Sequence, residues 1–119
     1  MRQWMVDPEV MCQKHLCGCH VEHHMFIGSM KKKIKMDGYL KNNLLEPRSL
    51  YERHKVLSEE MTRRGMNHKS PLEENECECI CYLDECQQNW EIDKESALKD
   101  LLSRCPECES RYKEKYEKL

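Results

Sequence analysis

Aromatic side chains are scarce in this sequence, which holds one Phe and two Trp among its 119 residues. A chain of this length suits one domain with one modest hydrophobic core. With so few large aromatics, that core must be built mostly from Leu, Met, Ile, Val and Cys. The sequence also lacks any apolar run near the roughly 18 residues that a membrane span needs. We therefore expect a soluble protein with no membrane partner.

An export signal is also lacking. The N-terminus reads Met1-Arg2-Gln3-Trp4 and has neither the apolar block nor the small-residue cleavage site of a signal peptide. The nine cysteines are an odd number, which argues against a complete disulfide framework. In a reducing compartment, clustered thiols are more often metal ligands than bridges. We expect a cytoplasmic protein of a bacterial, archaeal or phage-infected host cell.

The net charge of −2 conceals an asymmetry. Residues 1–75 carry 13 Lys and Arg against 10 Asp and Glu, a balance of +3, whereas residues 76–119 carry 7 against 12, a balance of −5. A phosphate-binding surface would therefore belong to the first part. The alternative is an ordinary surface of mixed charge.

The spacing of apolar residues predicts helices. Asp7-Pro8-Glu9 combines an Asp cap with Pro in the first turn, so we expect a helix from there to about residue 33. Pro47 opens a second helix that ends at Arg63-Arg64-Gly65, and Asp93 caps a third. The stretch from Glu73 to Asn89 shows no clear period.

We therefore expect a mainly α, compact single-domain helical fold. Residues 1–72 would form its helical core. Residues 73–119 would form a Cys-rich, acidic C-terminal part that packs on the same domain and is stapled by zinc.

One helical stripe in the first predicted helix carries polar side chains. His15, Cys19 and Glu22 are spaced by four and three residues and so share a face, which Cys12 and His23 extend. Three interpretations compete. Glu22 is an acid or base with His15 beside the substrate, or some of the Cys and His side chains bind Zn²⁺. In the third, the Cys residues pack as small hydrophobes and the polar groups face water.

A second group of thiols lies downstream, where Cys77, Cys79, Cys81 and Cys86 precede Cys105-Pro106-Glu107-Cys108. A Cys-x-x-Cys pair with thiols about twenty residues upstream suits tetrahedral Zn²⁺. The alternatives are reduced thiols without a metal and a redox dithiol. Our first choice for a structural zinc site is Cys81, Cys86, Cys105 and Cys108.

Several blocks of residues 1–72 resemble a known family. Gln13-Lys14-His15-Leu16 followed by Glu22 is similar to the stretch with the catalytic glutamate in the endonuclease V-type pyrimidine-dimer DNA glycosylases of T-even phages. Arg53-His54-Lys55 through Arg63-Arg64-Gly65-Met66-Asn67 resembles a later helix of that family. The blocks Met1 to Pro8 and Gly65 to Leu72 resemble short bacterial and phage proteins placed with it.

The resemblance implies a DNA-repair glycosylase and abasic-site lyase whose first α-amine is the nucleophile. That amine attacks C1′, a Schiff base forms, and β-elimination cuts the strand, with no cofactor required. Arg2 is too bulky to allow removal of Met1, and alignment on His15 and Glu22 places the Met1 amine at the family's nucleophile position. Met1 and Glu22 are therefore the expected catalytic residues.

The implied partner is damaged or abasic double-stranded DNA, bound by a monomer. Val21, Met25 and Cys19 depart from the family's pattern, so abasic-site cutting is a firmer expectation than dimer specificity. The candidate DNA-binding residues are Arg2, His15, Lys31, Lys32, Lys33, Arg63, Arg64 and Lys69.

Two other functions remain open from the sequence. The chain could be a non-catalytic, zinc-stabilised module that binds nucleic acid or protein. It could also be a metal-dependent hydrolase that uses the His and Cys residues of the first helix.

Overall fold

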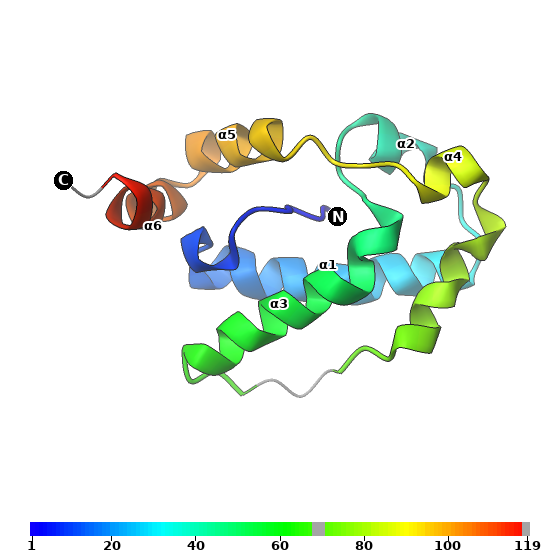
Figure 1. Cartoon of the computed structure of the whole chain (residues 1–119), viewed down its shortest axis with the longest axis horizontal. Helices are drawn as coiled ribbons and strands as arrows, with labels where there is room; N and C mark the ends of the chain where they lie inside the picture. The colour runs from blue at the N-terminus through cyan, green and yellow to red at the C-terminus, as the bar shows by residue number, and fades with distance from the viewer. Residues whose placement is uncertain (68–70, 118–119) are drawn as a thin grey trace.

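The computed structural model describes residues 1–67 and 71–117, and within these ranges all regular structure is helical (Figure 1). This confirms the predicted mainly α fold. None of the described helices combines the length and the apolar composition needed to span a membrane. The elements in chain order are η1 (Pro8–Val10), α1 (Gln13–Lys31), α2 (Asp37–Lys41), η2 (Pro47–Ser49), α3 (Leu50–Arg63), η3 (Glu74–Tyr82), α4 (Glu85–Gln88), α5 (Lys94–Arg104) and α6 (Pro106–Tyr116), where η marks a 3-10 helix.

The longest helix, α1, begins later than the sequence predicts. Asp7 caps only the short η1, where its carboxylate accepts the Glu9 N–H. The backbone is extended at Met11, with φ −73° and ψ 131°. Cys12 then caps α1, and its Sγ accepts the His15 N–H. The prediction of one continuous helix from Asp7 was wrong because this second cap, a thiol, carries no strong sequence signal.

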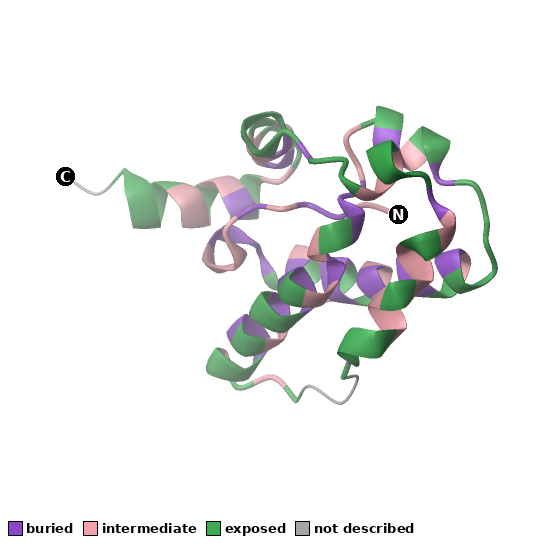
Figure 2. Ribbon diagram, turned by 45° about the vertical axis from the view of Figure 1, so that its right-hand side comes forward, coloured by how far each residue is buried: buried purple, intermediate pink, exposed green. Residues whose placement is uncertain are grey.

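Two clusters of buried side chains form the core. One gathers around the first half of α1 and includes Leu16, Leu57 and Leu101. The other gathers around the second half and includes Phe26 and Leu83. Both clusters mix side chains from before and after residue 72, and Figure 2 shows buried residues on the facing sides of the helices. The division of the chain at residue 72 stays a prediction.

The acidic stretch without a clear period folds as η3 and α4. Neither element has a buried residue. Without a buried apolar face, the apolar residues of this stretch need not recur with a helical period. After α4 the chain forms α5, which lies on the side of the N-terminal segment away from α1, and it ends in α6 (Figure 1). The third predicted helix is confirmed as α5, which Asp93 caps through the Ser96 N–H. The highly charged residues after Cys105 form α6, a helix that the sequence did not predict.

Candidate active site

The N-terminal segment runs through the middle of the molecule, between α1 and α5 (Figure 1). Gln3 is fully buried; its N–H donates to the Leu44 carbonyl at 2.8 Å, and its Oε1 accepts the Glu46 N–H at 2.7 Å. Trp4 is buried as well. These contacts hold the chain from its third residue onward, so the Met1 amine can occupy a defined place.

Glu22 lies beside the start of this segment. The backbone N–H of Arg2 donates to Glu22 Oε2 at 3.2 Å. Met1, Arg2 and Glu22 line one cleft, which His15 and Cys19 of α1 also line. The shared helical face that the sequence predicted is therefore the wall of this cleft. Its volume, about 760 Å³, lies in the range usual for small-ligand sites, about 300–1,000 Å³.

The opposite wall comes from the C-terminal part of the chain. Ser96, Asp100 and Arg104 of α5 line the cleft. Asn43, at the edge of the cleft, fastens the loop after α2 to the start of α5. Its Oδ1 accepts the Asp93 N–H at 2.7 Å, and its amide donates to the Asp93 carbonyl at 3.1 Å.

Arg2 joins the two walls. Its guanidinium forms an ion pair with Asp100 and lies 3.8 Å from the centroid of the Trp4 ring. Arg104 Nε lies 2.8 Å from the other Asp100 oxygen. The hydrogen bond from Arg2 lowers the pKa of Asp100 below its ordinary value. Asp100 is thus an anion already matched by two cations, whereas Glu22 accepts from a neutral backbone N–H.

Cys19 and His23 are both buried. Burial raises the pKa of the Cys19 thiol to about 11 and lowers the pKa of His23 to about 3. His23 Nδ1 lies 2.7 Å from the Cys19 carbonyl oxygen, which suits a neutral ring that donates there. Both side chains are therefore neutral near pH 7.

The predicted DNA-binding residues do not gather in one place. Of these residues, Arg2 and His15 line the cleft, whereas the exposed Lys32 and Lys33 follow the far end of α1. Ten residues of helix, about 15 Å, separate Lys32 from Glu22. Lys31 is paired with Glu76 at 3.0 Å.

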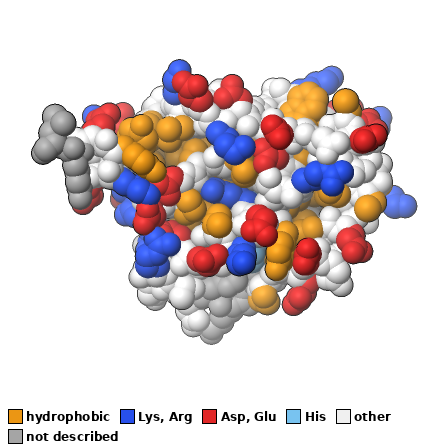
Figure 3. Space-filling model, viewed as in Figure 1, with side chains coloured by type: hydrophobic (Ala, Val, Ile, Leu, Met, Phe, Trp, Pro, Cys, Tyr) orange, Lys and Arg blue, Asp and Glu red, His pale blue; other side chains and the backbone are white. Residues whose placement is uncertain are grey.

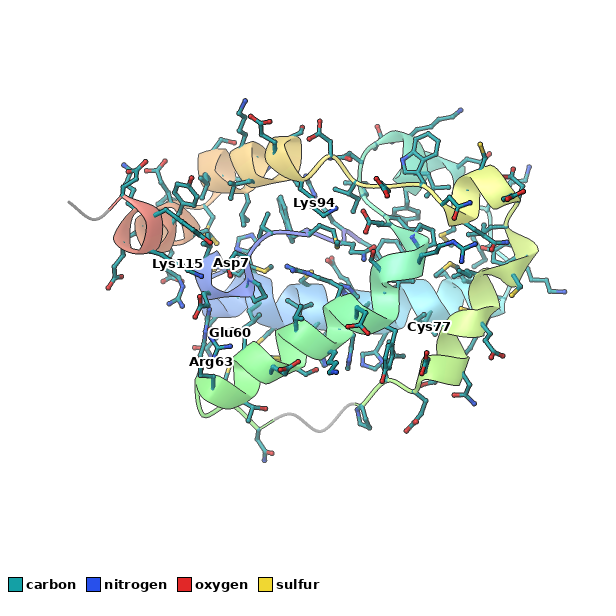
Figure 4. The ribbon with its side chains drawn as sticks, viewed as in Figure 1. Asp7, Glu60, Arg63, Cys77, Lys94 and Lys115 are labelled. Atoms are coloured by element: carbon teal, nitrogen blue, oxygen red, sulfur yellow. The ribbon has the colours of Figure 1, made fainter. Side chains whose placement is uncertain are left out.

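Arg63 and Arg64 lie at the end of α3. Both pair with Glu60, at 2.6 and 2.7 Å. Figure 4 labels Glu60 and Arg63. Arg64 also donates to the Pro8 and Met11 carbonyl oxygens. These contacts tie α3 to η1 and give Arg64 a structural role. Lys69 lies outside the described residues.

Sequence reasoning missed three charged residues of the cleft: Lys14, Asp100 and Arg104. Lys14 precedes His15 on α1 and could have been found from its place beside the polar stripe. Asp100 and Arg104 reach the cleft only because α5 folds back over the N-terminus. Over the face shown in Figure 3, acidic and basic side chains are interspersed with hydrophobic ones.

Among the residues that the structure describes, two groups of side chains could hold a metal ion. We call the first the Cys–His cluster; its ligand atoms lie within 4.8 Å of one another, and it comprises Cys12, His15, Cys105 and Cys108. The second comprises His20, His24 and His54, with 3.0 Å between the Nε2 atoms of His24 and His54. Burial raises the pKa of Cys12 and of Cys108, and burial lowers that of His15.

The predicted zinc set is only partly brought together. Cys105 and Cys108 lie in the Cys–His cluster, but the exposed Cys81 and Cys86 belong to η3 and α4 at the other end of the molecule (Figure 1). Cys77, on the same η3, and Lys115 of α6 mark these two ends in Figure 4. Helix α5 lies between Cys86 and Cys105 in the chain. Cysteines about twenty residues apart in the sequence therefore lie at opposite ends of the molecule.

Comparison with protein families was informative for the N-terminal part. The family described as pyrimidine dimer DNA glycosylase matches residues 1–74. Comparison with curated proteins and with solved structures gives no match. The matched residues include the N-terminal segment, α1 and α3, and they supply Met1 and Glu22 to the cleft. The chain belongs to the pyrimidine dimer DNA glycosylase family.

Proposed function

We propose that this protein is a DNA-repair glycosylase with abasic-site lyase activity, in which the Met1 α-amine is the nucleophile and Glu22 is its partner. The observation that carries the proposal is the hydrogen bond from the Arg2 N–H to Glu22, in a cleft that Met1 also lines. Arg2 directly follows Met1, so this bond supports a role for Glu22 near the terminal amine.

The amine is suited to attack a sugar carbon. An α-amine loses its proton more readily than a lysine side chain, so more of it is nucleophilic near neutral pH. On a damaged nucleotide it forms a bond to C1′ as the bond from C1′ to the base breaks, and the base leaves with a proton. On an abasic sugar it adds to the C1′ aldehyde and releases water. In the first route the bond from C1′ to the ring oxygen then breaks and that oxygen takes up a proton, so both routes lead to the same Schiff base.

Glu22 supports both halves of the reaction. As an anion it stabilises the positive charge that develops on the sugar while the base leaves. As a base it helps to remove a proton from C2′, after which the bond between C3′ and the phosphate oxygen breaks. These steps need no cofactor.

The nucleotide must leave the helical stack to reach this cleft. Extrusion costs a few kcal/mol, and damage or loss of the base lowers that cost. Arg2, Lys14 and Arg104 line the cleft and would meet the phosphates that flank the extruded sugar. The substrate is therefore damaged or abasic double-stranded DNA.

Borohydride trapping on DNA with a single abasic site tests the proposal. The purified chain should form a covalent complex, and a chain extended by two residues before Met1 should form none, because its amine no longer reaches C1′. Binding of the same DNA by the extended chain is the control for folding. Failure of the folded, native-length chain to form any complex would contradict the proposal, and a non-catalytic binding module would then describe the protein better.

A further inference from the structure

The Cys–His cluster joins the two ends of the chain. Cys12 Sγ lies 3.1 Å from His15 Nδ1 and 3.8 Å from Cys105 Sγ. Cys108 Sγ lies 3.7 Å from the same His15 nitrogen. Cys12 and Cys108 are buried, while His15 and Cys105 are half-buried at the edge of the cluster.

Two of these three distances match the edges of a zinc tetrahedron. With Zn–S bonds of about 2.3 Å and Zn–N bonds of about 2.0–2.1 Å, tetrahedral angles separate two sulfurs by about 3.8 Å and a sulfur from a nitrogen by about 3.6 Å. The 3.8 Å between Cys12 Sγ and Cys105 Sγ and the 3.7 Å between Cys108 Sγ and His15 Nδ1 agree with this geometry, and the 3.1 Å between Cys12 Sγ and His15 Nδ1 is about 0.5 Å shorter. A disulfide would need the sulfurs about 2.05 Å apart.

The backbone around the cluster also favours thiolates. Cys12 caps α1 and accepts the His15 N–H; Cys105 caps α6 and accepts the Cys108 N–H. Cys108 Sγ in turn accepts the Cys12 N–H at 3.2 Å. Two helix N-termini therefore converge on the cluster, and their dipoles and N–H groups stabilise negative sulfur.

Helix α6 needs a further anchor. Cys108 is its only buried residue in the part of the chain that the structure describes. Its other links to the N-terminal part include ion pairs of Lys115 with Asp7 and Glu9, and a 3.0 Å hydrogen bond from Arg111 to the Glu9 carbonyl. Exposed ion pairs contribute little, and an isolated helix of this length is marginal in water. Burial and surface contacts alone do not account for a docked α6.

We propose that the Cys–His cluster binds one zinc ion, which fastens α6 to the start of α1. The ion takes up three thiolates and neutral His15 through Nδ1, and it releases the thiol protons on binding. Because α6 follows α5 directly, the same ion holds α5 in place as the second wall of the cleft. The ligand on the cleft side, His15, carries its remaining ring proton on Nε2 once Nδ1 is bound to metal.

Metal content distinguishes this ligand set from the one that the sequence suggested. The full chain should be purified without added chelator and its zinc measured by mass spectrometry. We expect one zinc per chain in the native protein and in the matched control Cys81→Ser/Cys86→Ser, and none in Cys105→Ser/Cys108→Ser. The reverse pattern, or a native protein without zinc that takes up none when zinc is added, would overturn the proposal.

Cobalt gives a readout that does not depend on variants from which metal ligands have been removed. Co²⁺ added to the metal-free native chain should give the visible bands of tetrahedral coordination and thiolate-to-metal charge transfer. His15→Cys should keep the metal and strengthen the charge-transfer band, because a fourth thiolate replaces a ring nitrogen. An octahedral cobalt spectrum, or an unchanged band in His15→Cys, would contradict the assignment.

Hydrogen exchange tests what the ion holds. Removal of zinc should raise amide exchange in α6 at least tenfold and leave α3 unchanged, since α3 packs on α1 through the apolar side chains Leu57 and Met61. Equal protection of α6 with and without zinc would show that the ion is not its anchor. These measurements do not use DNA, so their outcome is independent of the trapping experiment.

Discussion

The two parts of the chain on either side of residue 74 contribute differently to the cleft. Residues 1–74 match the family and supply the terminal amine, Glu22 and His15. Residues 75–119 lie outside that match and supply the opposite wall with Asp100 and Arg104. The first part carries a net charge of +3 and the second −5.

The two parts therefore differ in role: the first supplies the groups that we propose to react, and the second completes the cleft around them. The groups that we propose to react lie within the first 22 residues, where short-range geometry relates them: a helix face and an adjacent N-terminal segment. The second part closes the cleft and neutralises Arg2 through Asp100. Variants of Met1 and Glu22 should therefore affect the reaction, and variants in the second part should affect stability and DNA affinity.

The largest effect is expected from Glu22→Gln. The amide is close in shape but can neither remove a proton nor stabilise a cation as an anion does, so abasic-site cutting should slow by about 10²- to 10⁴-fold. Single-turnover cutting rates would measure this. Glu52→Gln, at an exposed position on α3, is the matched control and should cut at the native rate. Equal rates for both variants would show that Glu22 takes no part in the reaction.

Removal of a core side chain from α5 tests the second part. Leu101 is fully buried, and Leu101→Ala should lower the free energy of unfolding by about 2–5 kcal/mol through lost apolar contacts and a cavity. Leu102, next to it and half-buried, is the control, and Leu102→Ala should cost less than Leu101→Ala. Urea titration measures both. Similar losses would show that α5 does not pack in the core as described.

Buried His23 makes the stability of the folded chain depend on pH. Burial lowers its pKa to about 3 in the folded chain, against about 6.5 when unfolded. The unfolded state therefore binds the extra proton first, so stability present above pH 6.5 is lost as pH falls from 6.5 towards 3. The loss approaches about 1.4 kcal/mol per pH unit.

Comparison with His23→Gln isolates this contribution. The variant lacks the titrating ring, so its unfolding free energy should fall less steeply over the same pH range. Denaturant titrations at several pH values give both slopes. Parallel slopes would mean that His23 is not kept neutral by burial.

The smallest effect is expected from Arg104→Ala. Arg104 lines the cleft, so its loss should weaken binding of abasic DNA a few-fold and reduce the salt slope of binding by about one. Lys99 on the same helix is a matched control, because each residue pairs with the acid four positions earlier, Lys99 with Glu95 and Arg104 with Asp100. Equal salt slopes for Arg104→Ala and Lys99→Ala would place the DNA elsewhere.

Much of the fold could be predicted from the sequence. The helical period and the end signals at Arg63-Arg64-Gly65 and Asp93 led to α3 and α5. The start of α1 was misplaced, because Asp7-Pro8 caps a short 3-10 turn and a cysteine caps the helix itself. Helix α6 was missed because its surface is charged and only Cys108 is buried, which leaves no apolar stripe to read.

The candidate site, like the fold, could be predicted from the sequence only in part. His15, Cys19 and Glu22 could be grouped from their spacing, because positions three and four apart on a helix share a face. The cysteines could not be sorted, because spacing alone makes Cys81 and Cys86 as plausible as any other partners for Cys105. The actual neighbours, Cys12 and His15, precede Cys105 by some ninety residues.

By itself, then, the sequence determined the helical class, the family blocks and the polar face of α1, because each depends on contacts within a few residues. Only the tertiary structure decided that α5 forms the second wall of the cleft and that the start of α6 meets the start of α1. Such contacts depend on how whole helices pack around a shared core. A local pattern of residues does not encode which distant helix fills that place.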